Sequence, residues 1–281
     1  MNRTDRERFE ATGLVRLPGL LPDELTSRAL NLVYDKSEQA GVRRNGVWLL
    51  DQLTDEPVQR HNKRLLEGIR HARVLADLVT PDLKAAVEAA AGGPARPMMK
   101  WPQLLFSFPE PGSWSLPETV WHVDLPKLPN RRTTPGVQAF AMLDTVERGG
   151  GGTVVVQGGH RLLHDIPWLG SKQITYRLRR ESYFRELMSK QVKDRGRFLR
   201  DTVRCGDADL RVVELTGRRG DVYLVDMRLL HAPAPNVSAT PRIMWTQRFL
   251  TEATHDDMTA LFARMRAGYG TAGEAAAAAP S

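Results

Sequence analysis

Apolar and polar positions follow two different rhythms along the chain, a helical one in the first third and a strand-like one after it. Residues 22–24 are a proline followed by two acids, which is typical of a first helical turn, and apolar residues then recur at helical spacing until Gly41. A second such pattern begins with Thr80 as the expected N-cap and Pro81 behind it, and ends at a glycine pair. The pattern predicts two amphipathic helices.

From Pro97 onward, short β-like runs alternate with turns rich in proline and glycine. The expected strands cover residues 103–108, 120–123, 137–143, 153–156, 211–215, 221–225 and 242–250. One further helix is expected near residues 181–190. Seven short strands behind a helical region favour a closed or sandwiched antiparallel sheet.

The pattern predicts a single domain over residues 1–270. Its parts are a helical region over about residues 20–95, a β core over about 97–250, and a basic insertion within the core at about 171–210. A length of 281 residues suits one large β domain. The alanine-rich residues 271–281 are expected to be a disordered tail.

Composition narrows the class of protein. An apolar share of 41% and a charged share of 26% are those of an ordinary globular protein, and no apolar run approaches about 18 residues, so no membrane span is expected. The single cysteine, Cys205, cannot form an internal disulfide and fits a reducing compartment. The polar first residues lack a secretory signal. These features predict a cytoplasmic protein.

The positive charge is concentrated in one segment. Residues 171–220 contain 14 Lys and Arg against 7 Asp and Glu, a surplus equal to the net charge of the whole chain, +7. One interpretation is a basic wall for an acidic substrate, a phosphate or a nucleic acid. The other, which composition alone favours, is a solvated helical insertion with an arginine-rich surface.

The sharpest chemical pattern is the segment Trp121-His122-Val123-Asp124. In an extended segment, side chains two positions apart point to the same side, so His122 and Asp124 could bind one cation. His231 follows an apolar strand and precedes a proline-rich loop, which places it at the rim of a sheet. Two histidines and one carboxylate are the ligands of oxygen-activating non-haem Fe(II), and zinc is the next candidate.

A basic residue could complete the site from a neighbouring strand. Arg242 lies eleven residues after His231, beyond a turn, so it can enter the same cavity. Its planar guanidinium fits a carboxylate, and a dicarboxylic keto acid that chelates a metal at one end would need such a partner at the other. Thr246 on the same strand face is expected to be a second donor.

Beyond His122, Asp124, His231 and Arg242, the chain from about Phe9 to Phe249 resembles the phytanoyl-CoA dioxygenase family of Fe(II)/2-oxoglutarate oxygenases. The similar segments, in the order that the family has them, are residues 9–22, 121–124, 151–161 and 220–231, followed by Arg242. The resemblance implies a mainly β fold, a double-stranded β-helix (jelly roll, cupin-like) with flanking α-helices. It also implies Fe(II) as cofactor, with 2-oxoglutarate and O2 as cosubstrates.

The resemblance suggests two more cosubstrate contacts. Phe140 falls where members often carry a tryptophan near the cosubstrate, and Gln103 is similar to a cosubstrate-contacting glutamine of the ectoine-hydroxylase-like branch. Two departures affect cosubstrate contacts: residues 157–160 read Gln-Gly-Gly-His where the family has Pro-Gly-Ser-His, and Pro233 stands where several members have serine. Asp124 is retained, so the resemblance does not favour halogenation.

We therefore expect an oxygenase that oxidises an unactivated C–H bond of a small substrate in bacterial specialised metabolism. The basic surplus favours an acidic substrate. Hydroxylation is the leading outcome, with desaturation, cyclisation or epimerisation as alternatives. A competing hypothesis is a nucleic-acid-binding protein, or an oxygenase acting on nucleic acid, whose basic segment stacks bases on its aromatic side chains Tyr176, Tyr183, Phe184 and Phe198. A third is a catalytically idle barrel that binds a small ligand. The sequence leaves the substrate and the oligomeric state open.

Overall fold

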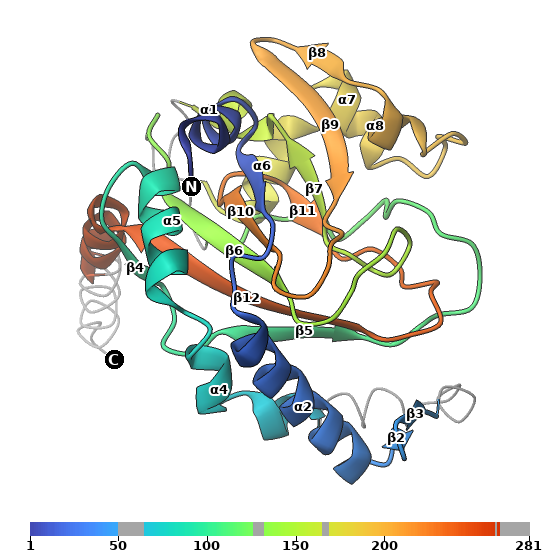
Figure 1. Ribbon diagram of the computed structural model, residues 1–281. Helices are drawn as coiled ribbons and strands as arrows, with labels where there is room; N and C mark the ends of the chain where they lie inside the picture. The colour runs from blue at the N-terminus through green and yellow to red at the C-terminus, as the bar shows by residue number, and fades with distance from the viewer. Residues whose placement is uncertain (50–64, 126–131, 165–168, 262, 265–281) are drawn as a thin grey trace, which may run out of the picture.

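Two antiparallel sheets form the centre of the molecule in the computed structural model, which describes residues 1–49, 65–125, 132–164, 169–261, 263 and 264 (Figure 1). The strands are β1 (Leu14–Leu17), β2 (Arg43–Arg44), β3 (Val47–Trp48), β4 (Ala95–Pro97), β5 (Gln103–Ser107), β6 (Gly136–Met142), β7 (Val154–Gln157), β8 (Val203–Cys205), β9 (Ala208–Glu214), β10 (Val222–Asp226), β11 (His231–Ala232) and β12 (Arg242–Thr251). The helices are α1 (Arg3–Thr12), α2 (Asp23–Gln39), α4 (Arg73–Ala76), α5 (Pro81–Ala91), α6 (Ser171–Leu178), α7 (Ser182–Leu187) and α8 (Arg197–Arg200), with a 3-10 helix η2 (Gly159–Leu163).

The larger sheet has the order β1-β10-β6-β12-β4, with β5 also paired to β12, and the smaller sheet has the order β11-β7-β9-β8. Strands distant in sequence are neighbours in both sheets, as in a jelly roll. The register places Thr246 of β12 between Phe140 of β6 and Gln103 of β5. Three of the predicted site residues therefore lie in one row across the larger sheet.

Alternation along each strand separates two environments. On β12, Ile243, Trp245 and Phe249 belong to the apolar core under the helices, and the Trp245 indole N–H donates to the Leu75 carbonyl at 2.9 Å. Met244 instead joins a separate buried cluster that also contains residues of the smaller sheet and its connections. Strand residues of opposite parity thus face the space between the sheets, where polar side chains can be held in a protected interior.

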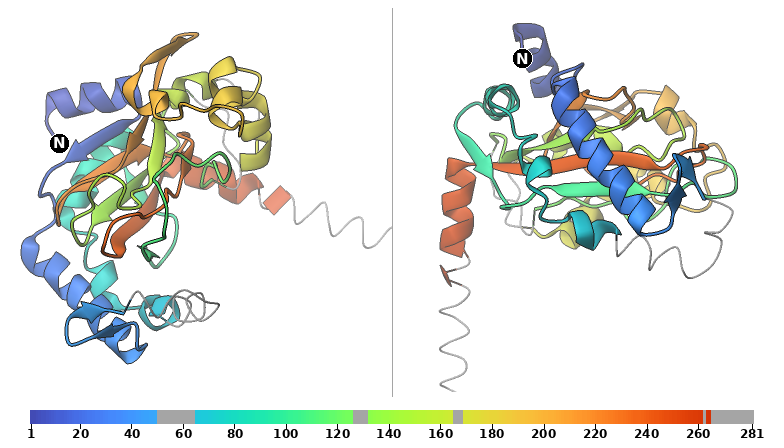
Figure 2. Two further views of the ribbon diagram at one scale, coloured as in Figure 1. Left: turned by 90° about the vertical axis from the view of Figure 1, so that its right-hand side faces the viewer. Right: turned by 60° about the horizontal axis from the view of Figure 1, so that its bottom comes forward.

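Helices α1, α2, α4 and α5 lie outside the larger sheet (Figure 2). The predicted helices are confirmed: α2 begins directly after Pro22, and α5 begins at Pro81, with the Thr80 hydroxyl accepting the Leu83 N–H at 3.1 Å. Gly92 ends α5 with φ of +76°, a conformation that glycine adopts without strain. Among the helices that the structure describes, none is both long and apolar enough to cross a membrane.

The basic segment packs onto the outer face of the smaller sheet. Ile174 and Phe184, from α6 and α7, share one buried cluster with residues of β7 and β9. Three of its four aromatic side chains, those of Tyr183, Phe184 and Phe198, are buried, whereas Tyr176 is 71% exposed. Most of the aromatic surface that the nucleic-acid hypothesis requires is therefore part of the core.

One of the seven predicted strands is wrong. Residues 120–123 form no strand: Val120 has φ of +59°, which interrupts extended backbone, and only His122 makes an isolated bridge. The other six predicted strands occur, with ends shifted by a few residues. The helix predicted near 181–190 is shorter, covering Ser182–Leu187. Residues 271–281, the predicted tail, lie outside the described residues.

Candidate metal centre

A reciprocal backbone contact joins the two histidine-bearing segments. The His122 N–H donates to the His231 carbonyl, and the His231 N–H donates to the His122 carbonyl, both at 3.0 Å. This single antiparallel bridge sets the two imidazole rings side by side, with their centroids 4.4 Å apart. One hydrogen-bonded residue pair, in place of the strand predicted at residues 120–123, therefore positions His122 beside His231.

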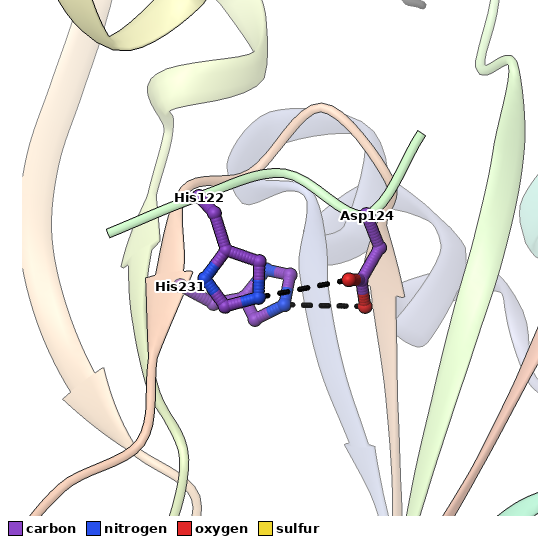
Figure 3. A group of neighbouring side chains, drawn as sticks. All are labelled: His122, Asp124 and His231. Atoms are coloured by element: carbon purple, nitrogen blue, oxygen red, sulfur yellow. Dashed lines mark ion pairs between the residues drawn. The ribbon is translucent and has the colours of Figure 1, made fainter. Parts of the chain in front are cut away.

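Asp124 completes the group (Figure 3). Its Oδ1 lies 3.6 Å from His122 Nε2, and its Oδ2 lies 3.4 Å from His231 Nε2. One ligand atom from each residue lies within 4.8 Å of the other two. Ligand atoms that share one metal at bond lengths of about 2.1 Å are about 3 Å apart, so a small contraction would suffice. The described residues contain no other such group of histidine, cysteine or carboxylate side chains.

Backbone carbonyls fix the tautomer of both imidazoles. His122 Nδ1 lies 2.7 Å from the Val120 carbonyl oxygen, and His231 Nδ1 lies 3.2 Å from that of Leu229. Because a carbonyl oxygen only accepts hydrogen bonds, each Nδ1 carries the proton and donates. In the neutral form of each ring, the Nε2 lone pair then faces the carboxylate of Asp124, which is the orientation that metal-binding histidines require.

Two of the three side chains, His122 and Asp124, have shifted pKa values. Burial, followed by the nearby His231, lowers the pKa of His122, so its imidazole is neutral near pH 7. Burial opposes ionisation of Asp124, but the hydrogen bond and charge of His231, and then those of Arg248, outweigh burial and hold the pKa of Asp124 well below its usual range. His122 is therefore neutral and Asp124 anionic, which are the charge states that a bound cation prefers.

Two residues that the sequence analysis did not identify hold Asp124 in place. Arg248 donates from Nε and Nη2 to Oδ2 of Asp124 at 2.7 and 2.6 Å, and the Gln138 amide donates to the same oxygen at 2.8 Å. The Asp124 side chain is only 14% exposed. These contacts occupy Oδ2 and fix the carboxylate, while Oδ1 remains directed toward His122.

The cosubstrate residues expected from sequence lie around this group in different ways. The Phe140 ring packs edge-on against the His231 ring, with centroids 6.0 Å apart. Gln103 is exposed and accepts a hydrogen bond from Arg248 at 2.9 Å. The buried Thr246 hydroxyl donates to the Ala139 carbonyl at 2.9 Å and accepts from Gln138 at 3.2 Å. In this arrangement Thr246 supports Gln138 and has no hydrogen left to donate to a cosubstrate.

Arg242 lies apart from the ligands, six residues before Arg248 on β12. It is 7% exposed, and its Nη1 donates to the Gly151 carbonyl at 2.7 Å, while its Nε is buried with no partner. Burial lowers the pKa of Arg242 to about 10, so the guanidinium is still charged at pH 7. No carboxylate pairs with it among the described residues. Ser107, directly opposite on β5, also has a buried hydroxyl without a partner.

The residues missed by the sequence analysis left a weak signal in it. Arg248 lies two positions after Thr246, and Gln138 two positions before Phe140, so both share the interior side with a predicted site residue. A polar residue at such a position needs a buried partner. Parity along β6 and β12 could have identified both, although not which partner they contact.

Comparison with known proteins agrees with the geometry. A family model described as phytanoyl-CoA dioxygenase matches residues 9–244. Among solved structures, the chain is similar to the non-haem alpha-ketoglutarate-dependent carbocyclase SnoK from nogalamycin biosynthesis, with 17% identity over 89% of this chain and 84% of that chain and a TM-score of 0.52. It is also similar to AviO1 from Streptomyces viridochromogenes Tue57, with 18% identity over 89% and 95% of the chains and a TM-score of 0.51. These structures confirm the predicted fold class. No curated protein matches the chain.

Proposed function

Because the chain belongs to the phytanoyl-CoA dioxygenase family of iron- and 2-oxoglutarate-dependent oxygenases, we propose that His122, Asp124 and His231 bind its Fe(II). The observation that supports this assignment is the convergence of two Nε2 lone pairs and a fixed carboxylate oxygen within 4.8 Å. Two histidines and one carboxylate on one side of an ion are the ligands of non-haem Fe(II) and leave the other positions open. Membership of the family, rather than the ligand types alone, favours iron over zinc.

The second part of the proposal is that Arg242 binds the far carboxylate of 2-oxoglutarate. A charged guanidinium with an unpartnered Nε is buried in the interior, and the unpartnered Ser107 hydroxyl lies directly across the strand pair. Leaving such groups unpaired is costly, and a carboxylate could accept from both. Gln103 and Phe140 would then lie nearer the metal end of the cosubstrate.

Bound iron with 2-oxoglutarate supplies the oxidising chemistry: O2 and 2-oxoglutarate convert R–H to R–OH, giving succinate and CO2, with one oxygen atom in succinate and one in the product. The chain's own residues supply the surroundings. The bridge between His122 and His231 fixes the ligand geometry, and Arg248 and Gln138 fix Asp124. Phe140, against His231, keeps water from one side of the centre.

The proposed substrate is a small molecule and the proposed outcome hydroxylation, with desaturation, ring closure or epimerisation as alternatives from the same oxidant. A cavity of about 720 Å³ beside His122 could hold such a molecule. A role in bacterial specialised metabolism is proposed by analogy with SnoK, which by its name acts in nogalamycin biosynthesis. We also infer a cytoplasmic location from the single free cysteine, Cys205.

Anaerobic addition of Fe(II) and then 2-oxoglutarate tests the assignment. The wild-type chain should develop a metal-to-ligand charge-transfer band and form succinate once O2 is admitted. His122→Ala and His231→Ala should lose both signals, because each removes one of three ligands. His255→Ala, a histidine outside the group, is the matched control and should keep both. Full retention of the band in the two ligand variants would refute the proposed centre.

A further inference from the structure

One face of helix α6 lies beside the candidate metal centre. Thr175 and Tyr176 lie three and four residues after Lys172, and Arg179 lies four and three residues after them, so all four side chains share one side of the helix and its C-terminal end. All four line the cavity of about 720 Å³ that also contains His122. The start of the basic segment therefore forms a wall of the cavity next to a proposed iron ligand.

A hydrogen bond ties this wall to the ligand segment: the Ser171 hydroxyl accepts the Val123 N–H at 3.1 Å. The Thr175 hydroxyl donates to the Ser171 carbonyl at 3.0 Å and lies 3.5 Å from the Trp121 carbonyl. Val123 lies between the proposed ligands His122 and Asp124 in the chain. The position of α6 is thus coupled to that of the metal centre.

The charge of this wall is unbalanced. No Asp or Glu lines the cavity, and no ion pair among the described residues involves Lys172 or Arg179. Arg177 and Arg180, which line an adjoining hollow of about 350 Å³ together with Lys172 and Tyr176, have no ion pair there either. The unpaired cations thus surround Tyr176, whose ring is exposed.

Several basic residues farther along the same segment have hydrogen-bonding partners within the protein. Arg197 pairs with Glu186, Arg200 pairs with Asp194 at 2.6 Å, and Arg204 pairs with Asp209 at 3.1 Å. Arg195 is buried and donates to four backbone carbonyls. Four basic residues without an ion pair among the described residues, Lys172, Arg177, Arg179 and Arg180, therefore lie on or directly after α6, at the cavity and the adjoining hollow.

We infer that the cavity binds an anionic small-molecule substrate, whose carboxylate or phosphate contacts Lys172 and Arg179 and whose apolar body lies along Tyr176 and Pro233 toward His122. This inference rests on the proposed function, because it concerns the substrate of the same centre. Lys and Arg bind either anionic group, and charge-assisted hydrogen bonds are stronger than neutral ones. A small molecule fits better than a nucleic acid because only one aromatic side chain of the segment is exposed.

The test uses the metal-free full chain and three naphthalene probes followed by fluorescence anisotropy: 1-naphthyl phosphate, 1-naphthoate and neutral 1-naphthol. Both anions should bind the wild-type chain more tightly than 1-naphthol does. The double variant Lys172→Gln/Arg179→Gln should bind the anions about tenfold more weakly. Arg204→Gln, which removes a paired arginine of the same segment, should bind like wild type. The tighter of the two anions identifies the preferred acidic group.

Three results would overturn the inference: no binding of either anion, equal binding of the neutral probe, or wild-type affinity in the double variant. Tighter, salt-sensitive binding of a fluorescein-labelled 12-nucleotide single strand would replace it with nucleic-acid binding. The double variant should keep the charge-transfer band with Fe(II) and 2-oxoglutarate, which also shows that it folds. Loss of that band in the wild-type chain, with anion binding retained, would refute the iron assignment and leave the anion site standing.

Discussion

At the scale of single residues, the candidate centre depends on which polar atoms have partners and which do not. Asp124 Oδ2 accepts from Arg248 and Gln138, so that oxygen is fully occupied by the protein. Arg242 Nε and Ser107 Oγ, by contrast, are buried without partners. The first set holds a proposed metal ligand, whereas the second matches a ligand that comes from outside.

Arg242→Lys separates charge from shape at the proposed carboxylate site. Lysine keeps the positive charge but loses the planar fork, so the KM for 2-oxoglutarate should rise about tenfold or more, while kcat at saturation changes little. Ser107→Ala should raise the same KM less, because it removes one neutral donor. Steady-state succinate formation measures both. An unchanged KM in the lysine variant would remove Arg242 from the cosubstrate site.

At the scale of elements, a buried ion pair at the end of β10 supports the larger sheet. Asp226 accepts from Arg228 Nε at 2.9 Å and from Nη2 at 2.7 Å, and the two side chains are 1% and 3% exposed. Asp226→Asn would remove the negative charge from this buried pair. The free energy of unfolding should fall by about 3–5 kcal/mol in urea denaturation. Asp194→Asn, in an exposed pair, should change the free energy of unfolding far less.

The same pair predicts how stability depends on pH. Burial alone would raise the pKa of Asp226, but the charge and hydrogen bonds of Arg228 outweigh burial and lower it. Its contribution is therefore complete above about pH 4, the range of an unfolded aspartate, and is lost as pH falls through the lowered pKa of the folded state. Urea denaturation between pH 7 and pH 3 should show a flatter acid limb for Asp226→Asn. An identical slope in both proteins would contradict this assignment.

Elements with strong local patterns could be predicted from sequence, and those set by contacts across the fold could not. α2 and α5 have their own starts and stops, and β6, β10 and β12 are apolar runs long enough to stand alone. The strand predicted at residues 120–123 was wrong. The β-branched and aromatic composition of this segment suggested a strand, but the backbone turns at Val120.

The candidate site, like the fold, could be predicted only in part. The types of His122, Asp124 and His231 suggested a ligand group, and the structure brings them together. Parity along β12 indicates that Arg248 is an interior polar residue but not what it contacts, because its partner depends on the pairing of β12 with β6 and on the position of the segment that contains Asp124. The unpaired cations of α6 were also hidden, since composition counts charges but not which of them are paired.

At the scale of the whole molecule, the candidate centre lies where the two sheets meet. His231 belongs to β11 of the smaller sheet, whereas the side chains that hold Asp124 come from β6 and β12 of the larger one. A bound ion would therefore link the two sheets. Figure 2 shows how the basic segment and the N-terminal helices flank this junction from different sides.

Binding at this junction should stabilise the whole fold. Ligand at about 100 times its Kd adds about 2.7 kcal/mol, which corresponds to a rise of several degrees in the melting temperature of a domain this size. Anaerobic differential scanning calorimetry with Fe(II) and 2-oxoglutarate measures the shift. The shift should vanish in His231→Ala, and 2-oxoglutarate without metal should give a smaller one. A wild-type melting temperature unaffected by the metal would contradict binding at the junction.

The backbone bridge between His122 and His231 also has a consequence for biosynthesis. The second histidine leaves the ribosome long after the first, and the two meet only once the sheets have assembled. A nascent, truncated or partly unfolded chain would therefore present scattered ligands that cannot retain a redox-active ion. Iron would therefore bind only after the two sheets have assembled. An immature chain would then hold no iron that could react with O2.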